Sequence, residues 1–234
     1  MARHPRVGSR LEFSRLKLVI ANKNYSSWSM RPWVLLREAQ IPFEEVQLKF
    51  GDDGKPLDVA RYSPTRKVPA LILDNGETVW DSLAICEAVA ELHPEKKLWP
   101  EPPRARRAAR AVCAEMHSGF QALRTHLAMN IRSRHPGKGI TAESRTDIDR
   151  IVEIWTSCRR QFGAGGELLF GKFSVADAFY APVATRFQTY AVALPDAAQA
   201  YCGAVLAVPA VREWVDAACR ETEFVPADEP YAKR

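Results

Sequence analysis

Short apolar runs and one amphipathic stretch alternate over the first fifty residues. Residues 16–21 (LKLVIA) predict a short buried strand. Residues 33–40 (WVLLREAQ) continue a helical pattern that begins near Met30, and the mostly alternating apolar positions of 41–50 predict a second strand. This part of the chain therefore predicts a strand-helix-strand unit.

A hairpin and a helix are predicted next. In residues 68–80 (VPALILDNGETVW) two apolar runs flank Asp74-Asn75-Gly76, which is a strong turn signal. Residues 81–93 repeat apolar side chains at helical spacing. The order strand-helix-strand, then strand-strand-helix, predicts a mixed sheet with parallel and antiparallel parts.

The pattern changes after a proline-rich stretch at 93–104. Long helical patterns without hairpin signals follow: one long helix over 105–133, one over about 143–162, one from near Ser174, and a last one over 209–221. The fold class is thus an α/β domain followed by an all-α domain. We expect a mobile basic tail (1–15), the α/β domain (16–93), a linker (94–104), the helical domain (105–225) and a C-terminal tail (226–234).

Composition narrows the class of protein. The 234 residues are 47% hydrophobic and 26% charged, as in an ordinary soluble globular protein, and no stretch approaches the length of a membrane helix. The net charge of +5 comes largely from the tail and from residues 104–110, without the aromatic interleaving of a nucleic-acid site. The five cysteines are scattered, which argues against a disulfide framework or a metal site and is typical of a protein of the reducing cytoplasm. We expect no nucleic acid, membrane or metal as a partner.

Three stretches of the α/β domain carry candidate chemistry. A cis bond between Val68 and Pro69 would leave the N–H and C=O of Val68 free to pair with an extended peptide, although only about 5–6% of X-Pro bonds are cis. Asp81 and Ser82 begin a helix, where a ligand carboxylate or amine could bind and where a plain N-cap is the simpler reading.

The third stretch is NKNYSSWSMRPW at 22–33. A proline is tolerated in the first helical turn, so Pro32 predicts a helix that starts no earlier than about Ser29, with Ser29 as the N-cap. Ser26 and Ser27 would then precede the helix terminus, where a hydroxyl and the helix dipole would favour a bound thiolate. A serine-rich turn without a ligand is the alternative.

In the second half, Ser174 and Asp177 form a capping box that we read as structural. Met116 and His117 lie on the predicted long helix and could face the first domain.

These features together resemble the cytosolic glutathione transferase family. The family's cis-proline motif is similar to Val68-Pro69-Ala70-Leu71, its acidic-Ser motif to Asp81-Ser82, and its helical capping box to Ser174 and Asp177. The resemblance covers about residues 16–225. It implies a thioredoxin-like first domain, an all-helical second domain and a homodimer.

Within the family, SSWSMR is similar to the SSCSxR motif of the zeta class, which includes maleylacetoacetate isomerase. Gapless alignment makes Ser26 the activating serine, which we slightly prefer, and anchoring on Arg31 makes it Ser27. Trp28 stands where the zeta motif has cysteine, which disfavours isomerase chemistry that relies on that cysteine. An indole there would more readily form a wall of the acceptor pocket.

The resemblance implies a glutathione site without a metal. Val68, turned outward by the cis bond to Pro69, would pair with the cysteinyl backbone. Asp81 and Ser82 would hold the γ-glutamyl end, and Lys67 could contact the tripeptide. The acceptor pocket would include Trp28, Met116 and His117. The implied function is a cytoplasmic detoxifying transferase that joins glutathione to a small, hydrophobic electrophile. The alternatives are a glutathione-dependent cis-trans isomerase and a non-catalytic binding or assembly module.

Overall fold

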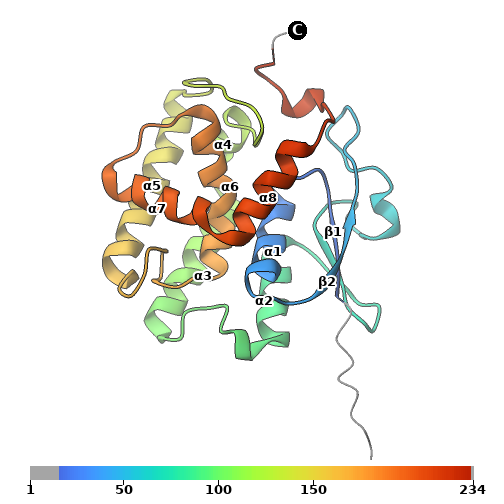
Figure 1. The fold of residues 1–234 in the computed structure, drawn as a ribbon, viewed down its shortest axis with the longest axis horizontal. Coiled ribbons are helices and arrows are strands. Elements are labelled where there is room, and N and C mark those ends of the chain that lie inside the picture. Colours follow the sequence, from blue (N-terminus) through green and yellow to red (C-terminus); the bar gives the residue numbers. More distant parts are fainter. Residues whose placement is uncertain (1–15, 233–234) are drawn as a thin grey trace, which may run out of the picture.

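The structure is a computed structural model that describes residues 16–232. The predicted basic tail at 1–15 lies outside the described residues. A sheet and two helices form the first half of the chain, and a bundle of helices forms the second (Figure 1). The predicted fold class, a mixed α/β domain followed by an all-α domain, is confirmed.

Four strands form one mixed sheet in the order β2-β1-β3-β4. Their bounds are Leu16–Ile20 (β1), Phe43–Gln47 (β2), Ala70–Ile72 (β3) and Thr78–Val79 (β4). β1 is parallel to β2 and antiparallel to β3, which pairs antiparallel with β4. The predicted hairpin is confirmed, and Gly76 adopts a φ of +84° in its turn, a conformation that glycine reaches without a steric penalty.

Helix α1 (Ser27–Glu38) lies between the sheet and the helical bundle (Figure 1). It packs against α2 (Ser82–Leu92), α6 (Val175–Tyr190) and α8 (Pro209–Arg220). The prediction of Ser29 as its N-cap is wrong, because α1 begins at Ser27 and Ser26 is the N-cap residue. Pro32 is accepted in the second turn, where it removes only the helical bond to the carbonyl of Trp28.

The bundle is built around α6, whose side chains are almost all buried. Its helices are α3 (Pro103–Ser118), α4 (Gln121–His126), α5 (Ala142–Phe162), α6 (Val175–Tyr190), α7 (Asp196–Ala207) and α8 (Pro209–Arg220). The capping box at the start of α6 is confirmed, with Asp177 Oδ2 accepting from the N–H of Ser174 at 3.0 Å. Helix α7 was not predicted.

The single helix expected over 105–133 is wrong. It ends at Ser118, and Gly119 and Phe120 separate α3 from α4. A Cβ on Gly119 would lie 2.9 Å from the carbonyl oxygen of Glu115, so only glycine fits this bend. Phe120 takes a φ of +62°, and its side chain is buried in the core. The break between α3 and α4 thus places the Phe120 ring in the core, and helical periodicity alone did not reveal it.

The described residues after α8, 221–232, pack against the rest of the protein. We call them the C-terminal strap. Glu221 binds the loop before α1, and the hydroxyl of Tyr231 donates to the carbonyl of His126 at 2.8 Å. The predicted C-terminal tail, 226–234, is therefore largely a docked segment.

Candidate active site

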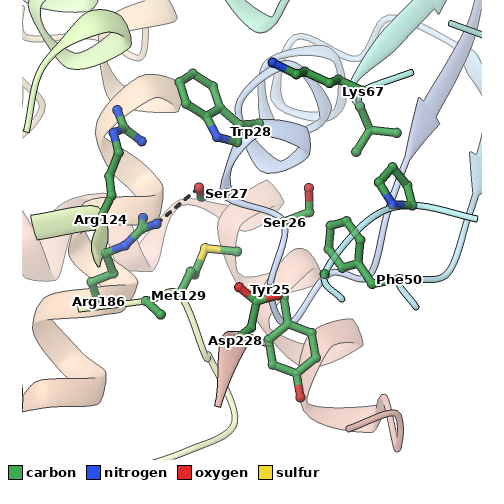
Figure 2. A pocket seen from close by; sticks show the side chains of 14 residues that line it. Tyr25, Ser26, Ser27, Trp28, Phe50, Lys67, Arg124, Met129, Arg186 and Asp228 are labelled. Carbon is green, nitrogen blue, oxygen red and sulfur yellow. Dashed lines mark hydrogen bonds between the residues drawn. The ribbon is translucent and has the colours of Figure 1, made fainter. Parts of the chain in front are cut away.

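A cavity of about 310 Å³ opens where the start of α1 meets the helical domain (Figure 2). Its walls come from four parts of the chain. These are the loop into α1 (Tyr25, Ser26, Ser27, Trp28), the β2–β3 connection (Phe50, Gly54, Pro56, Lys67, Val68), the helical domain (Arg124, Ala128, Met129, Arg186) and the strap (Asp228). The cavity thus lies at the junction of the two domains.

The two candidate serines are both buried in this wall but differ in their hydrogen bonds. The hydroxyl of Ser26 donates to Ser29 Oγ at 2.7 Å, so its proton is already engaged. Ser27 Oγ instead accepts from Nη2 of Arg186 at 3.2 Å. Because the Ser27 hydroxyl is an acceptor in this contact, its own proton is free for a ligand, and the neighbouring cation makes it a better donor.

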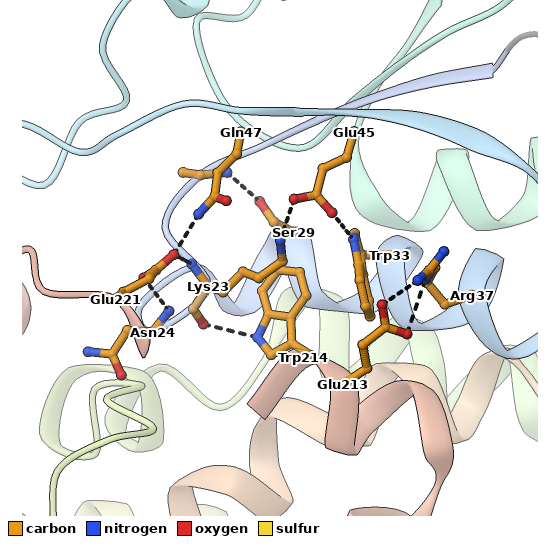
Figure 3. A network of polar contacts seen from close by, with 11 residues as sticks. Lys23, Asn24, Ser29, Trp33, Arg37, Glu45, Gln47, Glu213, Trp214 and Glu221 are labelled. Atoms are coloured by element: carbon orange, nitrogen blue, oxygen red, sulfur yellow. Dashed lines mark hydrogen bonds and ion pairs between the residues drawn. The ribbon is translucent and has the colours of Figure 1, made fainter. Parts of the chain in front are cut away.

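A network of polar contacts fastens the loop that carries these serines (Figure 3). The two carboxylate oxygens of Glu221 accept from the backbone N–H groups of Lys23 and Asn24 at 2.7 and 3.0 Å. The indole N–H of Trp214 donates to the carbonyl of Lys23 at 3.0 Å, and the Lys23 ammonium pairs with Glu45. The loop is therefore held by the sheet, by α8 and by the strap at once.

Three arginines give the site its positive charge. Burial first, then the other guanidinium groups, lowers the pKa of Arg31 to about 9 and that of Arg186 to about 9, and burial lowers the pKa of Arg124. None of the three forms an ion pair with a carboxylate within residues 16–232. Nε and Nη2 of Arg31 and Nη1 of Arg124 are buried without a hydrogen-bond partner in that range. Such a cluster stabilises a bound anion.

Trp28, in the first turn of α1, contacts two of these arginines and a histidine of the second domain. The guanidinium carbons of Arg31 and Arg124 lie 4.2 and 4.6 Å from the centroid of the indole ring, within the range of cation–π attraction. The ring of His117 contacts the indole edge-on, with centroids 5.3 Å apart. The indole thus fills space beside the cavity and holds two cations in place.

The residues suggested for the acceptor pocket separate in the structure. Trp28 lines the cavity, whereas Met116 and His117 do not. Met116 is a core side chain, 1% exposed. His117 reaches Asp81, with 3.0 Å between Nε2 and Oδ2, and so joins α3 to the start of α2.

The suggested glutathione residues also fall into two groups. Lys67 and Val68 line the cavity, and the bond between Val68 and Pro69 is cis. Asp81 caps α2, since its Oδ1 accepts from the N–H of Leu83 at 3.0 Å, and Ser82 lies buried behind it. Neither Asp81 nor Ser82 lines the cavity itself. Arg31 contacts the second group, because its Nη1 lies 3.4 Å from Ser82 Oγ.

Sequence reasoning missed Arg124, Arg186 and Asp228. A signal for Arg186 was present, because it is a charged residue inside an otherwise apolar helical stretch. A charge that is buried in this way requires hydrogen-bond or charge partners. Asp228 carried no comparable signal, because it stands in a polar segment after the last predicted helix.

Comparison with known proteins identifies the family. Residues 25–92 match the sequence model described as "Glutathione S-transferase, N-terminal domain", and residues 104–217 match that of the C-terminal domain. The chain is 33% identical over 168 residues to a probable maleylacetoacetate isomerase of Caenorhabditis elegans, covering 69% of this chain and 75% of that protein. The chain belongs to the glutathione S-transferase family.

Two further comparisons agree with this assignment. The chain is 27% identical over 112 residues to a maleylacetoacetate isomerase of Dictyostelium discoideum, covering 47% of this chain and 51% of that protein. A solved glutathione transferase homologue from Burkholderia, described with bound glutathione, superposes with a TM-score of 0.66 at 21% identity, over 87% of this chain and 98% of that one. The structural likeness shows the shared fold.

Other features of the described residues add little to the site. Over 16–232, no helix is both long and apolar enough to cross a bilayer. The same residues contain no group of three or more His, Cys, Asp or Glu side chains placed to hold a metal ion. The five cysteines are free, and four of them are buried.

Proposed function

We propose that this protein binds glutathione in the cavity at the start of α1 and transfers its thiolate to a small electrophile. The observation that carries the proposal is the Ser27 hydroxyl, which faces the cavity at the N-terminal end of α1 while accepting a hydrogen bond from Arg186. A thiolate beside it would be stabilised by the hydroxyl, the guanidinium charge and the helix dipole.

We propose that Ser27 donates the hydrogen bond to the thiolate. The sequence had slightly favoured Ser26 for this role. Ser26 donates to Ser29 and so would have to break that bond to reach a ligand. Ser26 would instead set the conformation of the loop, since its backbone N–H also donates to the carbonyl of Asn22 at 2.9 Å.

The rest of the tripeptide would lie along the β2–β3 connection. Val68 would pair with the cysteinyl backbone through its own N–H and C=O, and Lys67 would meet a carboxylate. Asp81 and Ser82 would hold the γ-glutamyl end just outside the cavity, with Arg31 supporting Ser82 from behind. The acceptor would bind between Trp28, Met129 and Arg124, on the helical side.

A glutathione-dependent cis-trans isomerase is the second candidate. Two relatives named maleylacetoacetate isomerase favour it, at 33% and 27% identity. The departure at Trp28 argues against it, because the indole occupies the place of the cysteine of the zeta motif. A non-catalytic binding module is less consistent with a serine hydroxyl and two arginines, Arg124 and Arg186, that line one cavity.

The proposal extends to assembly and location. We expect a homodimer, as in most of the family, and a cytoplasmic protein involved in detoxification. Free, mostly buried cysteines are compatible with a reducing compartment. Light scattering coupled to size exclusion would test the dimer, for which a monomeric mass is the contrary result.

The test of the function combines binding with turnover. Calorimetry should show glutathione binding at millimolar or lower concentration, and a generic aryl halide should be conjugated. Failure to bind at millimolar concentration would exclude both enzymatic candidates. Binding with isomerisation of a cis-dienone and no conjugation would favour the second candidate, and binding without either reaction would favour the module.

A further inference from the structure

One carboxylate of the cavity is left without a role by the proposed function. Asp228 lies on the C-terminal strap and lines the same cavity as Ser26, Ser27 and Arg186 (Figure 2). Within residues 16–232 its side chain forms no hydrogen bond and no ion pair. It is also partly removed from water, which is costly for an unpaired carboxylate.

The strap holds Asp228 against the cavity by contacts of its neighbours. The carboxylate of Glu229 accepts from the Tyr25 hydroxyl at 2.7 Å and from Asn130 Nδ2 at 2.6 Å. On the other side, a Cβ added to Gly54 would lie 3.2 Å from the Cβ of Ala227 and 3.7 Å from Asp228 Oδ2. The strap is therefore packed directly on the β2–β3 connection, and Asp228 belongs to the wall of the site.

Glu229 and Asp228 are adjacent but differ in what they can do. The Glu229 carboxylate is occupied by Tyr25 and Asn130 and also lies 3.6 Å from Arg132. Its function is structural. Asp228 keeps both oxygens available to a ligand or to a bridging water.

We propose that Asp228 accepts the proton of the bound glutathione thiol and later returns it to the product. This rests on the proposed function, which places the thiol at Ser27. The acceptor class that uses both halves of such a cycle is a conjugated carbonyl compound, in which addition across the C=C bond needs one proton back.

The S–H proton passes to Asp228, directly or through one water, and the sulfur keeps the electron pair next to Ser27 and Arg186. The thiolate forms a C–S bond to the β-carbon, and the π electrons move onto the carbonyl oxygen as an enolate. Asp228 then gives its proton to the α-carbon as the C=O re-forms, which leaves the carboxylate ready for the next cycle.

The charges around Asp228 make it suited to this exchange near neutral pH. Burial first, with a contribution from Glu229 against the opposing effect of Arg186, raises the pKa of Asp228 to about 6. Arg186 keeps its proton well above that pH, and burial raises the pKa of Tyr25 to about 12. The other basic groups of the cavity are Lys67 and Arg124.

The test compares Asp228→Asn with Glu223→Gln, using glutathione and benzylideneacetone as the conjugated acceptor. Glu223 is a matched control, because it is another carboxylate of the strap, paired with Lys49 outside the cavity. In the wild type and in Glu223→Gln, kcat/KM for the acceptor should fall as pH drops below about 6. In Asp228→Asn the fall near pH 6 should be absent, leaving only the decline set by ionisation of the bound thiol, and kcat/KM near neutral pH should be about 100-fold lower, with the KM for glutathione nearly unchanged.

The other outcomes overturn the proposal. A decline in kcat/KM near pH 6 that persists in Asp228→Asn, or a kcat/KM of that variant within about threefold of the wild type, would show that the carboxylate moves no proton. An equal loss in Glu223→Gln would mean that the position of the strap matters and not this group. Absence of glutathione binding to the wild type would refute the proposed function and this role with it. Normal turnover by Asp228→Asn, with an unchanged pH profile, would refute only this role.

Discussion

Arg186 donates a hydrogen bond to the hydroxyl of Ser27, with 3.2 Å between Nη2 and Oγ. The contact joins the middle of the second domain to the first turn of α1. It turns the Ser27 hydroxyl into an acceptor for the protein and leaves its proton for a ligand. Among residues 16–232, this buried cation is otherwise hydrogen-bonded only to the carbonyls of Leu127 and Pro182, and through Ser27 it acts at the candidate active site.

Replacing Ser27 with alanine should raise the pKa of the bound glutathione thiol and lower kcat/KM by about 10- to 150-fold. This loss is equivalent to roughly 1.5–3 kcal/mol, the contribution of one charge-assisted hydrogen bond. Ser26→Ala is the matched comparison, and its effect should be smaller because Ser26 donates to Ser29. Steady-state kinetics across a pH series would measure both. A larger loss in Ser26→Ala would assign the role to Ser26.

Replacing Trp28 with alanine should lower the free energy of unfolding by about 2–4 kcal/mol, because the ring packs on His117 and covers Arg31 and Arg124. Chemical denaturation would measure the change. Trp28→Cys should be destabilised to a similar extent while restoring the cysteine of the zeta motif. Gain of isomerase activity in that variant would support our reading of Trp28, and isomerase activity already present in the wild type would contradict it.

Removing the side chain of Glu221 should loosen the loop before α1. Glu221→Ala leaves the buried backbone N–H groups of Lys23 and Asn24 without their acceptors, at an expected cost of about 2–4 kcal/mol. The control is Glu213→Ala, which removes an exposed partner of Arg37 and should cost no more than about 1 kcal/mol. Equal losses in the two variants would refute the anchoring role of Glu221.

Asp228 should make stability depend on pH in a specific direction. Its pKa is raised to about 6 in the folded protein, above the ordinary value of 3.8, so the folded state binds more protons between these two values. The contribution of Asp228 to the free energy of unfolding is therefore complete at low pH and is lost as pH rises through about 6. Asp228→Asn should melt at a higher temperature than the wild type near neutral pH, and the difference should vanish toward pH about 4. A difference that does not change with pH would contradict the raised pKa.

Local patterns predicted most of the fold. The apolar runs and the Asp-Asn-Gly turn identified the sheet, because these signals lie within a few residues of each other. The break at Gly119 was missed, since helical spacing continues across it and only the close approach of the Glu115 carbonyl requires glycine there. Pro32 was misread because a helix fixed by packing on both faces tolerates a proline in its second turn.

The site was predictable only in part, for a similar reason. Ser26, Ser27, Lys67 and Val68 lie in short motifs of one domain, and all four line the cavity. Arg186 and Asp228 reach it from residues about 160 and 200 positions further along the chain, and nothing local indicates where they fold. Met116 was chosen for its position on a helix, but its side chain packs in the core.

We propose that the cavity binds glutathione and stabilises its thiolate at Ser27. The most direct test is to titrate the ultraviolet absorbance of the thiolate in the complex as a function of pH. We predict that the bound thiol ionises at least about one unit below the ordinary thiol pKa of about 8.5, and that Ser27→Ala removes most of this shift. A bound thiol with an unshifted pKa, or a shift that survives in Ser27→Ala, would contradict the account.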